Sequence, residues 1–207
     1  MEIIFKKRHL DTNFNYDNPD CIGIKTPDYN VSNDYDGKNI KKSSEINTND
    51  WIGELSHCPG INSILKLGYI YSLSYDLKFT YDGSNHSISP EQRYEDAVII
   101  KSDPTRFVGS KGLVSDLIKN PMYKIDTDIF MITENGISTL IVEPFYRRNM
   151  NYSITPGLLN TDNYEKDGRM ESVNLLNFFL TWDRDHEDEL IIPARTPLAQ
   201  IIPYKRK

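Results

Sequence analysis

The run from Tyr123 to Tyr146, YKIDTDIFMITENGISTLIVEPFY, constrains the fold more than any other stretch of this chain. Two apolar runs flank Asn135 and Gly136. An Asn-Gly pair between such runs is the strongest short-range signal for a β-hairpin, because both turn residues take positive φ. The sequence therefore predicts two antiparallel strands that pair with each other across this turn.

Short apolar runs bounded by turn residues recur along the rest of the chain, and each is expected to form one strand. They cover residues 69–83, 97–102, 170–182, 189–194 and 197–205. Short helices are expected at 58–68, where Pro59 suits a first turn and Gly68 an end, and at 110–120. Many short strands with one or two short helices predict a mostly β fold, either a barrel or a sandwich.

The first fifty residues differ in composition from the rest. MEIIF suits one strand, but the segments after it are rich in Asn, Asp, Ser and Lys. Such segments bury too little apolar surface to offset the entropy of ordering them. We therefore expect a loop-rich N-terminal arm over residues 1–50 and a single β-rich domain over 51–207. Arms and exposed strand edges are commonly covered by partner subunits, so a homo-oligomer is expected.

Charge and cysteine content narrow the class of protein. A formal net charge of -6 argues against broad nucleic-acid binding, which needs clustered Lys and Arg. Cys21 and Cys58 form no CxxC pair, so two reduced, mostly buried thiols are expected, as in a cytosolic protein. No signal-peptide pattern and no run of about 18 apolar residues is present, so we expect neither export nor a membrane span. The expected location is a cytoplasm, or a particle packaged from one.

The stretch TPGLLNTDNYEKDG, residues 155–168, is a tight polar corner between two predicted strands. It offers backbone amides together with Asn160, Asp162 and Tyr164. Short polar side chains can fix hydroxyl groups and an aromatic ring can stack on a sugar, so the pattern suits a sugar or phosphate pocket. The alternative is a β-corner in which Asn160 and Asp162 only satisfy the backbone of the local turn.

Several motifs of this half of the chain resemble the dUTPase and dCTP-deaminase superfamily. That family has a corner of the form G-V-I-D-x-D-Y-x-G, then a strand V-x-L-x-N, then a strand containing R-I-A-Q-L-I. The matching positions here are Gly157, Leu158, Leu159, Asp162, Tyr164 (displaced by Asn163), Val173, Leu175, Asn177, Leu198, Ala199, Gln200 and Ile201. The resemblance implies a β-clip or dUTPase-like barrel, or a related β-sandwich, for the last quarter of the chain.

The resemblance also implies roles for individual residues. In the family the first Asp of the corner activates water, the Tyr packs against deoxyribose and the Gln lies near the phosphates. Asn160 stands at the position of the water-activating base, and an amide accepts no proton at neutral pH. Arg195 replaces a family Gly in the last strand. Family-type hydrolysis is therefore expected to be lost or rerouted, which leaves a diverged or non-catalytic binding module.

A ligand site follows from these motifs and from two arginines that precede the corner. Arg147 and Arg148 can hold an anion bidentately, although ordinary ion pairs with the surplus acids are the alternative. The predicted ligand-binding residues are Asn160, Asp162, Tyr164, Arg147, Arg148 and Gln200. We expect a nucleotide or another small anion as ligand and no cofactor, with Mg²⁺ only where nucleotide phosphates are bound.

Three further cues extend over the whole chain: CPG at 58–60, the PG corner at 156–157 and TPLAQIIP at 196–203. Together they resemble a group of marine-phage proteins of unassigned function. This resemblance implies a phage-encoded protein that acts in the host cytoplasm or is associated with the virion.

Two other functions fit parts of the sequence. A structural or virion-assembly protein would have a flat oligomeric surface and no pocket chemistry. A non-haem iron oxygenase would use the H-x-D spacing of His9 and Asp11, with His186 as the distal ligand. Such ligands normally project from barrel strands, whereas His9 lies in the predicted arm and His186 in a charged turn.

Overall fold

A computed structural model of the chain confirms the mostly β class. The structure describes residues 3–8, 31–32, 39–46, 57–81, 86–89, 97–101, 122–145, 151–162, 165–166, 169–170, 175–182 and 188–206. The strands within these residues are β1 (Ile3–Arg8), β2 (Val31–Ser32), β3 (Ile40–Lys42), β4 (Tyr69–Ser72), β5 (Leu77–Tyr81), β6 (His86–Ser89), β7 (Ala97–Lys101), β8 (Met122–Thr133), β9 (Ile137–Val142), β10 (Tyr152–Thr155), β11 (Gly157–Leu159), β12 (Glu165–Lys166), β13 (Arg169–Met170), β14 (Leu175–Trp182), β15 (Glu189–Ile192) and β16 (Pro197–Lys205).

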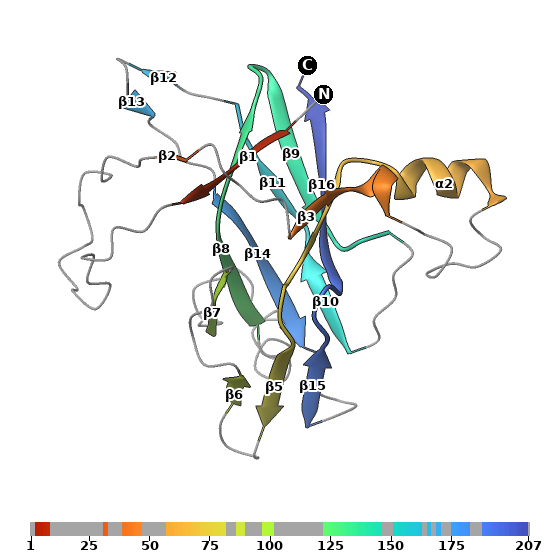
Figure 1. The fold of residues 1–207 in the computed structure, drawn as a ribbon, viewed down its shortest axis with the longest axis vertical. Helices are drawn as coiled ribbons and strands as arrows, with labels where there is room; N and C mark the ends of the chain where they lie inside the picture. The colour runs from red at the N-terminus through yellow and green to blue at the C-terminus, as the bar shows by residue number, and fades with distance from the viewer. Residues whose placement is uncertain are drawn as a thin grey trace, which may run out of the picture.

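The first sheet is built around β8, a strand of 12 residues (Figure 1). Its strand order is β10-β14-β8-β1-β2, and β7 also pairs with β8. One side of β8 carries β14, while the other side is shared by β1 and β7. β1 and β2 belong to the first fifty residues, as does β3 in the second sheet, so three segments of the predicted arm supply strands to the sheets.

The second sheet has the order β11-β9-β16-β4-β3, with β16 at its centre. The prolines of β16 lie outside the stretch of this strand that is paired on both sides. Pro197 is the first residue of the strand, and Pro203 pairs with β9 beyond Ile201, where the pairing with β4 ends. This placement agrees with the rule that strand prolines occupy ends and edges.

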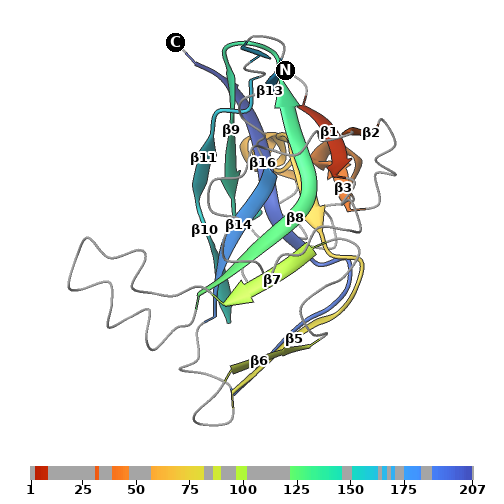
Figure 2. The same cartoon turned by 90° about the vertical axis from the view of Figure 1, so that its left-hand side faces the viewer.

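The two sheets face each other and enclose the hydrophobic core (Figure 2). Aromatic rings join them: Tyr71 of β4 meets Phe178 of β14 edge to face, with ring centroids 5.6 Å apart. Phe5 of β1 meets Tyr69 of β4 in the same way at 5.0 Å. T-shaped pairs of this kind add stabilisation beyond the burial of their area. The architecture is therefore an antiparallel β-sandwich.

The segment 69–83, expected to form one strand, forms two strands in different sheets. β4 ends at Ser72, and β5 pairs with β15 and β6 in a third sheet at the lower end of Figure 1. The strand is interrupted because the segment that pairs with it, which joins β15 to β16, turns at the same place. The backbone N–H of Arg195, which has φ +63°, donates to the Leu73 carbonyl at 2.7 Å, and the Ala194 N–H donates to Asp76 Oδ1 at 2.7 Å.

The hairpin predicted at Asn135 and Gly136 is also wrong in its pairing. β8 and β9 meet at this turn, but they belong to different sheets. The Ile137 N–H donates to the Glu134 carbonyl at 3.1 Å, and Gly136 has φ +81°. Asn135 does not share the positive φ, since Arg195 is the one such non-glycine residue in the part of the chain that the structure describes. This is the pattern of a type II turn, which splays its flanking strands.

The helix predicted at 58–68 is confirmed as α2 (Pro59–Leu65), and a 3₁₀ turn, η2 (Ser43–Glu45), lies beside its C-terminal end. Pro59 occupies the first turn, and Gly68 takes φ +65° after the end. A side chain at Gly68 would collide with the backbone of Ile201. Cys58 is free and exposed, which corrects the expectation of a buried thiol. Cys21 and the helix expected at 110–120 lie outside the described residues.

Candidate functional site

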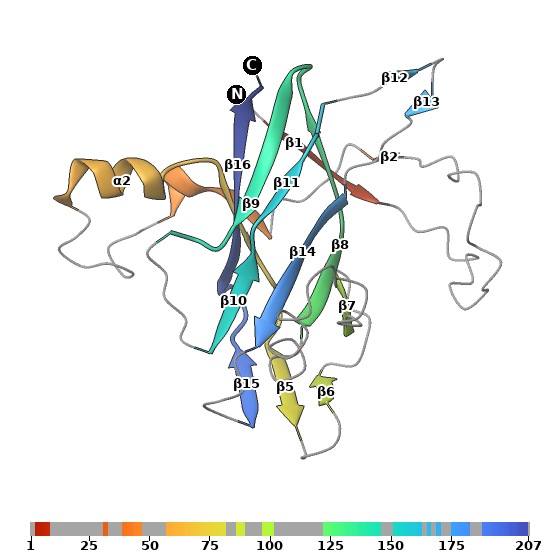
Figure 3. The same cartoon turned by 180° about the vertical axis from the view of Figure 1, so that it is seen from behind.

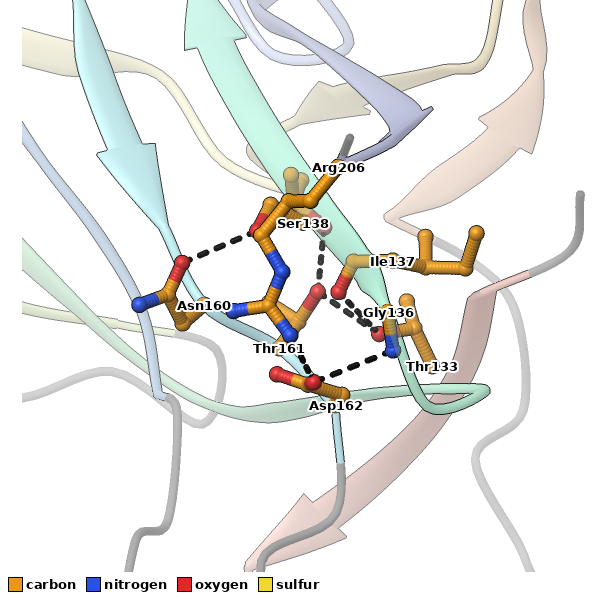
Figure 4. A network of polar contacts seen from close by, with 9 residues as sticks. Thr133, Gly136, Ile137, Ser138, Asn160, Thr161, Asp162 and Arg206 are labelled. Atoms are coloured by element: carbon orange, nitrogen blue, oxygen red, sulfur yellow. Dashed lines mark hydrogen bonds and ion pairs between the residues drawn. The ribbon is translucent and has the colours of Figure 1, made fainter.

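The polar corner at residues 160–162 lies between the ends of β8 and β9 (Figure 4). On one side β11 pairs with β9, with Leu159 opposite Thr139. On the other side the Thr133 N–H donates to the Thr161 carbonyl at 2.9 Å, and Thr133 forms a parallel bridge with Asp162. The corner segment therefore occupies the place where a hairpin would have paired β8 with β9 directly.

Three buried threonines form a hydrogen-bonded chain through this corner. The Oγ1 atoms of Thr139 and Thr161 lie 2.7 Å apart, and those of Thr161 and Thr133 lie 2.9 Å apart. The Thr133 hydroxyl donates to the Ile137 carbonyl at 3.1 Å. Because a hydroxyl has one proton to donate, the chain runs from Thr139 to Thr161 to Thr133 and ends on that carbonyl. All three side chains are thus engaged within the fold.

Asp162 is the buried acid of the corner, with 2% of its surface exposed. Its Oδ2 accepts the N–H of Gly136 at 3.1 Å and an N–H of the Arg206 guanidinium. The backbone N–H of Arg206 also donates to the Gly136 carbonyl at 2.8 Å. The other carboxylate oxygen of Asp162, Oδ1, is buried and has no hydrogen-bond partner among the described residues. The acid therefore joins the β8–β9 turn to the end of β16.

Asn160 occupies the exposed rim of the same corner. Its Oδ1 accepts the hydroxyl of Ser138 at 2.9 Å. An amide in this position can orient a hydroxyl group, but it cannot take a proton from water. The neighbouring carboxylate, that of Asp162, is held by Gly136 and Arg206. The corner is accordingly built for holding strands together, which is the alternative that the sequence left open for Asn160 and Asp162.

Gln200 lies elsewhere in the second sheet. It pairs with Val142, four residues along β9 from Ser138, and four strand residues span roughly 13 Å. Its side chain is 1% exposed and fully used: Nε2 donates to the carbonyls of Ile64 at 3.2 Å and Leu67 at 2.8 Å, and Oε1 accepts the Phe145 N–H at 3.1 Å. Gln200 thus anchors α2 to β16.

The structure brings Asn160 and Asp162 together and separates Gln200 from them. The remaining predicted ligand residues, Arg147, Arg148 and Tyr164, lie outside the described residues, and so do the metal candidates His9, Asp11 and His186. Across the described ranges no group of three or more His, Cys, Asp or Glu side chains is arranged to hold a metal ion.

An open groove of about 460 Å³ lies where η2, the end of α2 and β16 meet. Lys42, Ser44 and Lys66 provide its polar lining. Its apolar lining includes Leu67, Ile202 and Pro203. Sequence reasoning missed this site because its residues come from three distant segments, and each lysine alone has the pattern of an ordinary surface charge.

Glu143, which follows β9, has a shifted pKa. Burial raises the pKa of its carboxyl above the ordinary value of 4.5, and a hydrogen bond with the backbone of Ile154 partly opposes that rise. The backbone N–H of Phe145, two residues further along the chain, donates to Gln200 Oε1. Glu143 therefore lies in the packed connection after β9.

The sequence matches no protein-family model and no curated protein. The fold and the corner define the class of protein: an antiparallel β-sandwich whose polar corner joins three strands. In the part of the chain that the structure describes, no helix has the length and apolar character needed to span a bilayer.

Proposed function

We propose that this chain is a non-catalytic module of β-clip type that binds a small phosphate-bearing ligand, such as a nucleotide. The order of corner, β14 strand and A-Q strand supports the β-clip assignment. The engagement of Asp162 with Arg206 and Gly136, and the amide at Asn160, support binding rather than hydrolysis.

The groove at η2 carries this proposal. Two ammonium groups, from Lys42 and Lys66, and the hydroxyl of Ser44 offer charge-assisted hydrogen bonds to phosphate oxygens. The apolar wall formed by Leu67 and Ile202 suits the uncharged part of such a ligand. Ligand pockets commonly enclose roughly 300–1,000 Å³, and this groove of about 460 Å³ is within that range. Mg²⁺ would accompany the phosphates and needs no protein site of its own.

The resemblance to marine-phage proteins supports a phage-encoded protein. We place its action in the host cytoplasm, where free nucleotides are abundant, with virion association as the alternative location. In either location the ligand reaches the groove from solvent, since Lys42, Ser44 and Lys66 are all exposed.

Isothermal titration with dUTP, dCTP, dTTP and inorganic tripolyphosphate tests the proposal. We expect at least one of them to bind with Kd below about 100 µM, and the Lys42→Ala/Lys66→Ala variant to weaken that binding at least about tenfold. Lys41→Ala is the matched control, because Lys41 is the exposed neighbour of Lys42 on β3 and points to the other face of the strand. Tripolyphosphate separates recognition of phosphate from recognition of the base.

Two results would overturn the proposal. One is the absence of heat with all four compounds. The other is binding that survives in the double lysine variant but is lost in Asn160→Ala, which would locate the ligand at the corner instead of the groove.

A second candidate function, that of an assembly protein, is favoured by one specific observation. Within residues 151–160, Ser153, Thr155, Pro156, Leu158 and Asn160 are exposed, and none of the ten residues is charged.

A further inference from the structure

Lys42 and Ser44, two of the polar residues that line the groove, belong to one segment, residues 39–46, which contains β3 and η2. We call it the β3–η2 segment. The other lysine of the groove, Lys66, follows α2 directly. Figure 3 shows the β3–η2 segment beside the end of α2. The two lysines therefore enter one groove from two distant segments, and the contact between these segments determines how the lysines are placed.

Ser43, which lies between the two groove residues of the β3–η2 segment, makes that contact. Its backbone N–H donates to the Gly68 carbonyl at 3.0 Å, and its hydroxyl donates to the Leu67 carbonyl at 2.8 Å. Ser43 is 1% exposed, and a buried hydrogen bond is costly to leave unmade. Ser43 therefore holds η2 on the two residues that follow Lys66.

The Leu67 carbonyl is shared with a second buried side chain. Gln200 Nε2 of β16 donates to it at 2.8 Å, in addition to the Ser43 hydroxyl. A carbonyl oxygen has two lone pairs, so it can accept both hydrogen bonds. One oxygen atom thus fixes η2, the end of α2 and β16 relative to one another, and the groove lies where these three elements meet.

We propose that Ser43 is a positioning residue of the groove, which places Lys42 in the same groove as Lys66 so that both lysines bind one phosphate-bearing ligand. This inference rests on the proposed function. Ser43 acts through Lys42, because its own hydroxyl is buried and bound to Leu67. Two ammonium groups that line one groove repel each other, and an anion bound by both offsets that repulsion. A bound ligand should therefore hold the β3–η2 segment more firmly on α2.

Isothermal titration of Ser43→Ala with dUTP, dCTP, dTTP and inorganic tripolyphosphate tests the role of Ser43. The compound that binds the unchanged chain most tightly should bind this variant at least about threefold more weakly, which is the loss expected for one intramolecular hydrogen bond. Ser63→Ala is the matched control. The exposed Ser63 hydroxyl donates to the Pro59 carbonyl at 2.8 Å within α2 and does not line the groove, so this variant should bind like the unchanged chain.

A double-mutant cycle separates positioning from a general loss of stability. If Ser43 acts through Lys42, Ser43→Ala should weaken binding by less than about 1.5-fold when Lys42 is already replaced by alanine. A loss of stability alone would weaken binding by the same factor in both backgrounds. Equal factors, or full affinity in Ser43→Ala, would overturn the role of Ser43 and leave the ligand site standing. No binding by the unchanged chain would overturn the proposed function and this inference together.

Hydrogen exchange of the unchanged chain tests the same inference without any substitution. Exchange at the Ser43 amide requires its bond to the Gly68 carbonyl to open. A ligand that binds only when the β3–η2 segment is in place should slow this exchange by up to about 100-fold at a concentration of 100 Kd. Amides of β6, in the third sheet, are the control and should change much less. Exchange at Ser43 that is unaffected by a bound ligand would contradict the inference.

Discussion

The carboxylate of Asp162, almost wholly buried, is bound by the guanidinium of Arg206, 44 residues further along the chain. Arg206 also donates its backbone N–H to Gly136, whose own N–H donates to Asp162. Asp162 of the corner, Gly136 of the β8–β9 turn and Arg206 after β16 thereby form one ring of contacts. Arg206, the residue that follows β16, is attached to the corner by this ring.

Arg206→Ala should destabilise the protein by about 1–3 kcal/mol, because it leaves a buried carboxylate with the Gly136 N–H as its remaining partner. Urea unfolding followed by circular dichroism measures the change. Lys205→Ala is the control, since Lys205 is the exposed neighbour in β16 and should alter stability by less than about 0.5 kcal/mol. Equal effects of the two substitutions would show that the ring contributes no stability.

Gly136→Ala should cost about 1–2 kcal/mol, because φ +81° strains any residue with a Cβ atom. The cost is conformational alone, since a Cβ at this position has open space around it. Gly60→Ala in α2 is the opposite case: its Cβ also meets nothing, and a helical alanine should stabilise by roughly 0.5–1 kcal/mol. Unfolding midpoints that move in opposite directions would confirm the turn conformation.

Gln200→Leu should destabilise by roughly 2–4 kcal/mol, because it leaves the carbonyls of Ile64 and Leu67 and the N–H of Phe145 without this partner in a buried site. Hydrogen exchange should show faster opening of α2 than of the β8 core. Gln200→Glu retains an acceptor for Phe145 but loses the donor to α2, so α2 should open faster in this variant too. Unchanged α2 protection in both variants would contradict the anchoring role.

Glu143→Gln should stabilise the protein at neutral pH. Burial raises the pKa of Glu143 in the folded state above 4.5, so the folded chain holds this proton more tightly than the unfolded chain does. Stability from this group is full below pH 4.5 and is lost as the pH rises through the raised pKa. The stability difference between the variant and the unchanged chain should therefore grow with pH across that window and then level off.

Unfolding in urea at a series of pH values measures this difference. Glu134→Gln, which removes an exposed glutamate of the β8–β9 turn, reports the effect of deleting a surface charge. A stability difference for Glu143→Gln that matches this control at every pH would contradict the role of burial.

Local patterns determined much of the secondary structure. The strands at 97–101, 175–182, 189–192 and 197–205 lie within the runs that predicted them, and Pro59 and Gly68 bracket α2 as expected. These features depend on side-chain alternation and on backbone preferences of single residues, which act over a few positions. The position of the β8–β9 turn could be predicted from the sequence for the same reason.

Tertiary structure decided how these elements meet. The Asn135-Gly136 pattern predicted a hairpin, yet β8 and β9 enter different sheets because Thr161 and Asp162 bind between their ends. The segment 69–83 forms two strands because the segment that pairs with it turns at Arg195. The sequence by itself determined where strands and turns form, since those preferences are local. Strand pairing, the burial of Asp162 against Arg206 and the groove at Lys42 and Lys66 depend on contacts between distant segments, which only the folded chain brings together.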